Sequence, residues 1–223
     1  MIFQKNMRQN AFTLAEVLIT LAIIGVIAAI SVPSLIQKTN SAELKVAYKK
    51  AYAVASQAYD KASYDGLMIP RTAWNDNDNN MKNFNIFKTY FKVIKDCKNS
   101  DNANCWDNTG EKYFGTLPSS TAPSFIDSSG VAWSKNGVAG TGDELLIDTN
   151  GFKGPNKLGK DRWVFSPQMT NGSTIGVPDT LSIPPDCIST TDCEFMTSSG
   201  QTDYKQVCPS PPCYYTSWIA GKN

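Results

Sequence analysis

The order of apolar and polar residues predicts one long helix at the start of the chain. From residue 12 to residue 36 the chain is apolar, and Glu16 is the only ionisable side chain. About 25 residues at about 1.5 Å rise per residue reach roughly 37 Å, enough to cross a hydrocarbon core of about 30 Å. From residue 37 to residue 66 apolar side chains recur at three- and four-residue steps, and Gly66 and Pro70 end this pattern. We predict a helix from about residue 12 to about residue 64, whose alanine-rich second half packs on a sheet rather than on a membrane surface.

Polar segments and short apolar runs alternate after this helix. Residues 72–83, TAWNDNDNNMKN, are rich in asparagine and predict an exposed linker. Residues 85–97, NIFKTYFKVIKDC, space their apolar side chains like a short helix packed on the core. Runs bounded by glycine or asparagine then predict an antiparallel meander, with strands at residues 130–134, 144–148 and 162–166. These elements together predict an α+β fold.

The last part of the chain has a different composition. Residues 172–223 are rich in serine, threonine, proline and cysteine and contain few long apolar runs. Such a composition predicts surface loops whose order depends on disulfides. Tyr214, Tyr215 and Trp218 near the end fit the core-facing side of a last strand.

The cysteines indicate an oxidising compartment. All six lie outside the apolar segment, at Cys97, Cys105, Cys187, Cys193, Cys208 and Cys213. No two have the C-x-x-C spacing of redox pairs or zinc ribbons, and an even number suits up to three disulfides. Neighbours in the sequence make the pairs Cys97 with Cys105, Cys187 with Cys193 and Cys208 with Cys213 plausible, but spacing alone leaves the connectivity open.

Charge and the absence of histidine narrow the range of functions. Lysine and arginine number 21 and aspartate and glutamate number 20, so no net field attracts nucleic acid or acidic substrates. Histidine is absent, which removes Ser-His and Cys-His nucleophiles and the common histidine-containing zinc sites. We therefore expect no direct binding of nucleic acid and no enzymatic activity.

The residues before the apolar run predict its orientation in a membrane. Residues 1–11 carry Lys5 and Arg8 and no acidic side chain, so this end is expected on the cytoplasmic side. The cysteines after the run place the rest of the chain outside the cytoplasm. A secretory signal peptide cut near Ala28 and Ala29 is an alternative, but the run is long for such a signal and carries Glu16 near its start.

Glu16 needs a partner inside the apolar segment. Burying a carboxylate in an apolar helix costs on the order of a few kcal/mol unless a positive group pairs with it. If the chain were cut after Ala11, the new amine of Phe12 would lie one helical turn from Glu16, and every neighbouring copy would repeat this arrangement. A packed filament could then pair amine and carboxylate.

The run from Ala11, AFTLAEVLITLAIIGVIAAISVPSL, resembles the N-terminal motif of type IV prepilins and pseudopilins. The resemblance implies cleavage between Ala11 and Phe12 by a prepilin peptidase, N-methylation of Phe12 and a role for Glu16 in assembly. Thr13 and Leu14 fit the motif as well, while Ala11 stands where the family usually has glycine. It also implies a type IV pilin-like fold, with a disulfide-rich C-terminal region that faces outward and contacts partners. An outward-facing C-terminal region is the alternative to the core-facing position of Tyr214, Tyr215 and Trp218.

Gly25 and Pro33 also match the family pattern. Glycine weakens a helix and permits close packing, and proline removes a backbone donor. We therefore predict a bend or a melted turn in this part of the helix. Gly25 with Ala28 and Ala29 is also a packing face that any membrane helix could use.

Asp148, Asn150 and Asp161 are candidate calcium ligands. The D-x-N-G sequence resembles the start of a calcium loop, and the resemblance to pseudopilins, some of which bind calcium in this domain, supports the same candidates. The loop lacks the later acidic ligands of an EF-hand. A tight turn at Asn150-Gly151, with Asp148 capping backbone amides, is the favoured alternative. The surrounding stretch, GDELLIDTNGFKGPNKLGKDRWVF, resembles two strands and their connection in some pilin-like proteins.

The sequence thus predicts a structural subunit of a type IV pilus or of a type II secretion-like filament. An unprocessed, single-span membrane anchor for an extracytoplasmic binding domain is the alternative. The expected partners are a prepilin peptidase, other pilin-like subunits, an assembly platform with its ATPase, and the inner membrane, which the chain crosses once before it joins a periplasmic or surface filament. The predicted parts are a basic leader (1–11), a transmembrane assembly helix (12–36), its amphipathic continuation (37–66) and an extracytoplasmic globular domain (67–223).

Overall fold

A computed structural model describes most of the chain after residue 12. The described residues are 13–73, 77–97, 105–107, 109–113, 122–135, 144–171, 173, 175–189 and 207–221. Contacts divide the chain into two units, Met1–Ala42 and Glu43–Asn223. The predicted division of the chain into four parts stays a prediction.

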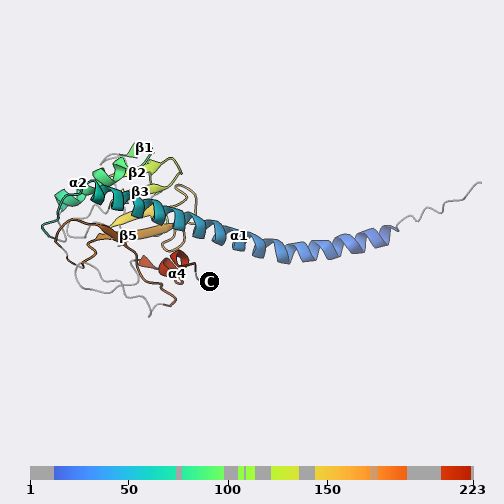
Figure 1. The fold of residues 1–223 in the computed structure, drawn as a ribbon. Coiled ribbons are helices and arrows are strands. Elements are labelled where there is room, and N and C mark those ends of the chain that lie inside the picture. The colour runs from blue at the N-terminus through green and yellow to red at the C-terminus, as the bar shows by residue number, and fades with distance from the viewer. Residues whose placement is uncertain are drawn as a thin grey trace, which may run out of the picture. The chain divides into compact units, whose positions relative to one another are not determined.

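Helix α1 (Leu14–Tyr64) begins in the first unit and continues into the second as 51 residues of uninterrupted helix (Figure 1). The predicted helix over about residues 12–64 is confirmed. The helix continues through Gly25 and Pro33, so the predicted melted turn is absent and only the bend stays a prediction. The C-terminal end of α1 is a Schellman motif, in which Leu67 N donates to Ala62 O and Gly66 adopts a φ of 67°.

Helix α2 (Asn77–Thr89) and strand β1 (Val93–Cys97) differ from the prediction. The segment predicted as a linker contains the first half of a helix, and the segment predicted as a helix ends in a strand. The linker prediction failed because the asparagines form structural hydrogen bonds: the Asn83 amide accepts from Ile69 N at 2.7 Å and donates to Ile69 O at 2.9 Å. Asparagine content alone does not distinguish this role from exposure to solvent.

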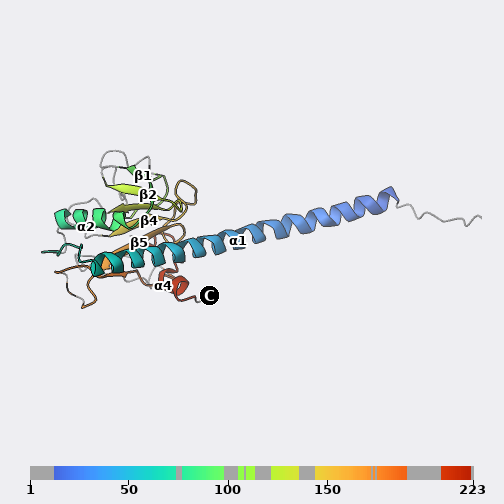
Figure 2. The same ribbon diagram turned by 45° about the horizontal axis from the view of Figure 1, so that its top comes forward.

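A six-stranded antiparallel sheet forms the centre of the second unit. The strands that follow β1 are β2 (Ser124–Asp127), β3 (Ala132–Lys135), β4 (Leu145–Asp148), β5 (Arg162–Gln168) and β6 (Thr180–Ser182). Each pairs with the next in chain order, so the sheet is a simple meander (Figure 2). The predicted strands at residues 130–134, 144–148 and 162–166 are confirmed as β3, β4 and β5, whereas β1, β2 and β6 were not predicted. The α+β class is confirmed.

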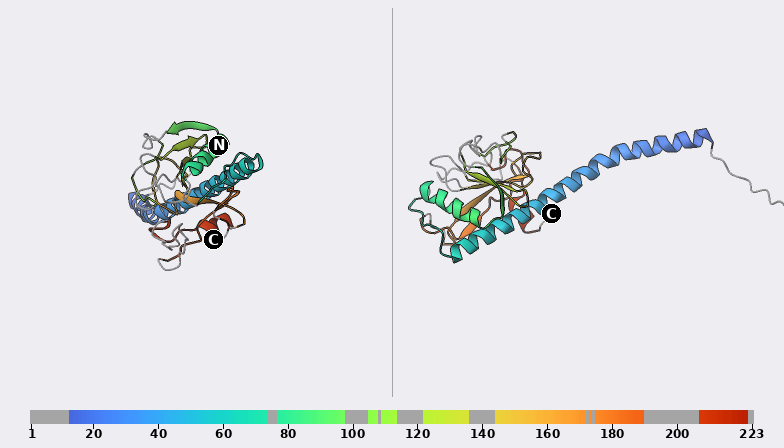
Figure 3. Two further views of the ribbon diagram at one scale, coloured as in Figure 1. Left: turned by 90° about the vertical axis from the view of Figure 1, so that its left-hand side faces the viewer. Right: turned by 90° about the horizontal axis from the view of Figure 1, so that it is seen from above.

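Both long helices cover the same face of this sheet (Figure 3). Cross-strand pairing puts one row of apolar side chains on that face: Phe125, Trp133, Ile147 and Trp163. Phe87 of α2 packs 5.8 Å from Trp133, and Tyr48 of α1 stacks on Trp163 at 3.7 Å, both measured between ring centroids. The predicted packing of the second half of α1 on a sheet is therefore present in the second unit.

The described C-terminal segment ends in a short helix, α4 (Tyr215–Ile219), rather than in the predicted strand. Tyr215 and Trp218 are buried and Tyr214 is half-buried against the core, so the predicted core position is correct for the first two although the element is wrong. Proline-rich residues 209–212 leave few backbone donors for a strand ladder, and a helical turn satisfies its own groups. Tyr48 Oη donates to Tyr215 O at 3.0 Å, which fixes α4 beside α1.

Disulfides close two short loops in the second unit. Cys97 is bonded to Cys105, and Cys208 is bonded to Cys213, as their spacing suggested. Cys187 is also disulfide-bonded, and its backbone pairs with that of Cys213. Cys193 lies outside the described residues. The C-terminal segment thus contains disulfides, as its composition predicted, and the dependence of its order on them stays a prediction.

Candidate functional site

Helix α1 begins with a capping box formed by Thr13 and Glu16. The Glu16 carboxylate accepts hydrogen bonds from Thr13 N at 2.8 Å and from Thr13 Oγ1 at 2.9 Å. The Thr13 hydroxyl in turn accepts from Glu16 N at 3.3 Å. This reciprocal arrangement satisfies backbone donors that a helix start leaves without partners. Glu16 therefore has hydrogen-bond partners within its own chain.

The first part of α1 exposes apolar side chains all around its axis. Leu14–Pro33 is long and apolar enough to cross a membrane, and none of it is buried in the structure. Its large side chains expose about half or more of their surface: Leu14, Leu18, Ile19, Leu21, Ile23, Ile24, Val26, Ile27, Ile30 and Val32. In water this exposure would be strongly unfavourable, because apolar burial contributes about 25 cal/mol per Å². A lipid phase or neighbouring helices must cover this surface.

Three residues within the apolar helix, Gly25, Ser31 and Pro33, differ from their neighbours in size or in hydrogen bonding. A Cβ added at Gly25 would meet no atom of the chain within 4 Å, so this position is free for close approach by another helix. The Ser31 hydroxyl donates to Ile27 O at 2.8 Å, and Pro33, two residues further on, has no N–H to donate. The sequence-predicted cleavage residues Ala11 and Phe12 lie outside the described residues.

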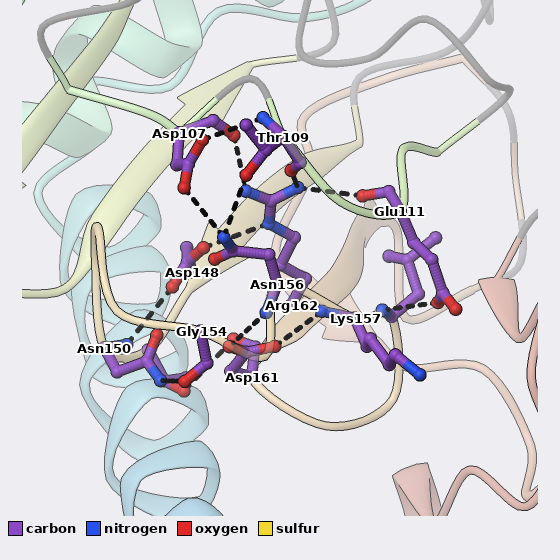
Figure 4. Close-up of polar contacts among 12 residues, drawn as sticks. Asp107, Thr109, Glu111, Asp148, Asn150, Gly154, Asn156, Lys157, Asp161 and Arg162 are labelled. Carbon is purple, nitrogen blue, oxygen red and sulfur yellow. Dashed lines mark hydrogen bonds and ion pairs between the residues drawn. The ribbon is translucent and has the colours of Figure 1, made fainter.

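A second group of polar residues lies in the globular unit, around Arg162 and Asp148 (Figure 4). Strand pairing puts these two residues on the sheet face opposite Trp163. Arg162 Nε lies 3.0 Å from Asp148 Oδ2, and both side chains are almost completely buried. The Arg162 guanidinium also donates to the backbone carbonyls of Asp107, Thr109 and Glu111. One buried cation thus connects two strands to a segment about fifty residues earlier in the chain.

Asp161 holds the loop between β4 and β5. Its two carboxylate oxygens accept hydrogen bonds from Asn156 N at 2.8 Å and Lys157 N at 2.7 Å (Figure 4). The Asn156 side chain donates to Asp107 Oδ2 at 2.8 Å. Burial and the nearby charge of Asp161 together raise the pKa of Asp148 to about 7, although the hydrogen bond from Arg162 opposes this shift.

The calcium candidates lie together in this network. The carboxylate oxygens of Asp148 accept hydrogen bonds from Asn150 N and from Arg162, and both oxygens of Asp161 accept from backbone amides, whereas Asn150 Oδ1 is buried without a hydrogen-bond partner in the described part of the chain. Among the described residues no group of three histidine, cysteine or acidic side chains is placed to hold a metal. This arrangement does not fit a calcium cage, which needs six to eight free oxygen ligands. Asp148 instead caps the turn at Asn150, the alternative that the sequence favoured, and the less favoured calcium site stays untested.

Comparison with known families gives one match, in the N-terminal segment. Residues 6–32 match the family model described as the prokaryotic N-terminal methylation motif. The chain carries the type IV pilin-like prepilin signature. The signature spans both predicted cleavage residues, the capping box and most of the apolar helix. It is a structural motif and not that of an enzyme class.

No curated protein and no solved structure matches the chain. The signature covers only the N-terminal segment, so the role of the globular unit has to be argued from its own residues.

Sequence reasoning missed two features of these sites. The capping box was visible as Thr-x-x-Glu ahead of an apolar run, a pattern that predicts a helix start. The contact of Arg162 with residues 107–111 had no local signal, since it joins segments far apart in the chain. An arginine at the first position of an apolar strand, with an aspartate directly before it, was the available hint.

Proposed function

We propose that the chain is a structural subunit of a type IV pilus or of a type II secretion-like filament. The observation that carries this proposal is the prepilin signature at residues 6–32, which coincides with the exposed apolar start of α1. A helix with apolar side chains on all sides suits a membrane before assembly and a bundle of identical helices afterwards. The buried network and disulfides of the second unit suit a rigid domain outside the cytoplasm.

Processing would create the group that Glu16 needs in the filament. A prepilin peptidase would cut between Ala11 and Phe12 and methylate the new amine of Phe12. In the single chain Glu16 accepts hydrogen bonds from Thr13 of its own helix. In the filament the positive amine of a neighbouring Phe12 would add to these bonds and set the register between subunits.

Assembly would need further partners. The chain has no P-loop or other nucleotide-binding signature, so an assembly platform with its own ATPase would supply the energy for extraction from the inner membrane. The basic residues before α1 place the globular unit outside the cytoplasm in this proposal. Other pilin-like chains would share the filament, and nucleic acid would not be a direct ligand.

An unprocessed membrane anchor is the competing function, because an apolar helix near the N-terminus is also what a simple anchor requires. The signature and the carboxylate of Glu16 favour the filament, since a plain anchor has no use for a charged side chain near its membrane end.

Intact-mass and N-terminal analysis of the protein from membranes, with and without the prepilin peptidase, tests processing. We expect a mature chain that starts at methylated Phe12 only when the peptidase is present. A chain that starts at Met1 in both membranes would favour the simple anchor. Glu16→Gln should then abolish incorporation into filaments while leaving processing intact, and Thr20→Val serves as the matched control within the same helix.

A further inference from the structure

The second unit has two distinct ends, defined by the direction of α1 along β5 (Figure 2). Tyr48 stacks on Trp163 near the start of β5, and Tyr52 packs 5.5 Å from Phe165 further along the strand. Arg71, beyond the end of α1, donates to Met169 Sδ just after β5. The helix and the strand therefore run in the same direction. The connection between β4 and β5 lies at one end of the sheet, and the C-terminal end of α1 lies at the other.

An exposed aromatic residue and several lysines occupy the first end. Within residues 149–161, here called the β4–β5 loop, Phe152 has 51% of its surface exposed. Lys153 and Lys157 are exposed and Lys160 is half-buried, whereas the acidic residue of the loop, Asp161, is completely buried. The loop thus presents an apolar ring beside positive charge.

The β4–β5 loop is held firmly behind this exposed tip. Asn150 Nδ2 donates to Gly154 O at 3.2 Å across the tip, and Asp161 fixes the return of the chain. Gly151 has a φ of 67° and lies so close to Gly130 that an added Cβ would come within 3.2 Å of its carbonyl oxygen. A preorganised loop loses little conformational entropy when its tip binds a partner. Exposed aromatic side chains in such positions often contribute much of the binding energy at protein interfaces.

The opposite end of the unit has a surface of complementary character. Apolar side chains are exposed there at the exit of α1 and on the segment that pairs with Arg71 through Gly176: Tyr64 (91%), Leu67 (53%), Ile175 (59%) and Val177 (37%). We call these four residues the α1 exit surface. Asp60 and Asp65 lie at the end of α1 and just after it, Asp179 follows Val177, and Asp78 lies at the start of α2, which Asn79 joins to the α1 exit through Pro70 O. The exposed cations of the two helix ends are Lys61 and Lys82. Negative charge is therefore in excess at this end.

We propose that the β4–β5 loop of one copy of this chain docks on the α1 exit surface of another copy. This inference rests on the proposed filament function and names a contact between its globular units. Apolar groups meet apolar groups, and the lysines of the loop meet the acids around the exit surface. Because the two surfaces differ and lie at opposite ends of one unit, the contact is head-to-tail, and such a contact builds an open filament when its rotation does not close a ring.

Cross-linking between two differently tagged full-length chains tests the contact. One chain carries Phe152→Cys and the other Leu67→Cys, and both are expressed together so that they enter the same filaments. All described cysteines of the native chain are in disulfides, so a short bis-maleimide reacts selectively with the new thiols. We expect a cross-link between the two tags. Ile94→Cys on the edge strand β1, with 63% of its side chain exposed, replaces Leu67→Cys as the matched control and should give none.

Charge reversal provides a second measurement. Lys153→Glu together with Lys157→Glu should lower filament yield about tenfold, and adding Asp60→Lys and Asp78→Lys should restore a large part of it. Lys95→Glu, on exposed β1, is the control and should leave filament yield unchanged. Each variant is first checked for its level in membranes and for its mature N-terminus, so that loss of assembly is separated from loss of folding or processing.

The outcomes separate this inference from the proposed function. If the native chain is processed and forms filaments, but the Phe152 and Leu67 thiols do not cross-link, the head-to-tail contact is wrong and the filament function stands. Cross-linking of Phe152→Cys mainly to itself would also refute the contact, since it would show a two-fold interface. If the native chain is neither processed nor assembled, the proposed function itself fails.

Discussion

Replacement of Arg162 by methionine should destabilise the globular unit severely. Arg162 Nε and Asp148 Oδ2 are 3.0 Å apart, and only 2% and 1% of the two side chains are exposed. Methionine retains much of the aliphatic volume but leaves Asp148 without its cation and the carbonyls of residues 107, 109 and 111 without their donor. Removing one partner of a buried ion pair costs about 3–5 kcal/mol. We expect the free energy of unfolding to fall by at least about 3 kcal/mol.

The ion pair between Lys88 and Asp96 provides a control with nearly the same N–O distance. Its N–O distance is 2.9 Å, but 23% and 40% of the two side chains are exposed. Surface ion pairs contribute about 0–1 kcal/mol, because water solvates both charges when the pair is broken. Lys88→Met should therefore lower the free energy of unfolding by less than about 1 kcal/mol. The comparison isolates burial as the cause of the difference.

The effect of Arg162→Met should also depend on pH. Burial raises the pKa of Asp148 from 3.8 to about 7, so the folded state binds this proton more tightly than the unfolded chain does. Protonation of Asp148 therefore favours the folded state below about pH 3.8, and this contribution is lost as the pH rises through about 7. Without Arg162 the carboxylate loses a stabilising cation and its pKa rises further. The destabilisation should be smaller at about pH 5 than at about pH 8.

Urea unfolding of the full-length protein in detergent micelles, followed by tryptophan fluorescence, measures these changes. Trp163 follows Arg162 in the sequence, and its side chain is buried on the opposite face of β5. Its fluorescence emission therefore reports on unfolding of the sheet. Near-equal losses for Arg162→Met and Lys88→Met at about pH 8 would refute the argument. A loss for Arg162→Met that does not change with pH would refute the part that concerns Asp148.

Four further predictions follow from the helix start, the aromatic core, the C-terminal disulfide and the candidate calcium ligands. Thr13→Val should weaken the start of α1 by about 1 kcal/mol, seen as about fivefold faster amide exchange over the first turn in micelles, while Thr20→Val should leave that exchange unchanged. Tyr48→Ala should lower the free energy of unfolding by about 3–5 kcal/mol and Tyr48→Phe by about 1 kcal/mol, and equal losses in urea unfolding would contradict the stacked packing. Joint replacement of Cys208 and Cys213 by serine should remove about 2 kcal/mol of loop-closure stabilisation, and an unchanged urea midpoint would contradict it. Calcium should leave the thermal midpoint unchanged, whereas an increase that a chelator reverses would show that the buried carboxylates do bind it.

Elements with long or strongly marked patterns could be predicted from the sequence. Helix α1 has an apolar pattern over fifty residues and a glycine at its end, so both its type and its extent follow from periodicity and capping. Strands β3, β4 and β5 combine buried apolar residues with flanking turns. These apolar side chains favour a buried strand whichever residues pack against them, so the strands can be predicted from the local sequence.

Elements that depend on distant partners could not be predicted in this way. Asn83 looks like a linker residue until its amide meets Ile69, and the strand character of β1 comes from pairing with β2. The same limit applies to α4, whose place is set by contacts of Tyr215 with Tyr48 and Trp163 rather than by its own propensity. At the candidate site, the capping residues were close in sequence and detectable, whereas the partners of Arg162 were not.

The buried network and the C-terminal segment stabilise the same loop, which affects how assembly defects should be interpreted. Glu111 accepts from Leu158 N and from Ser210 Oγ, so one carboxylate joins the β4–β5 loop to the disulfide-bonded segment. Gly159 lies so close to Cys213 that a side chain at this position would overlap it. Loosening either the network or the disulfide should therefore release the loop that presents Phe152. An assembly defect of Arg162→Met would report on the stability of this anchorage, and only substitutions of the exposed tip test the contact between subunits.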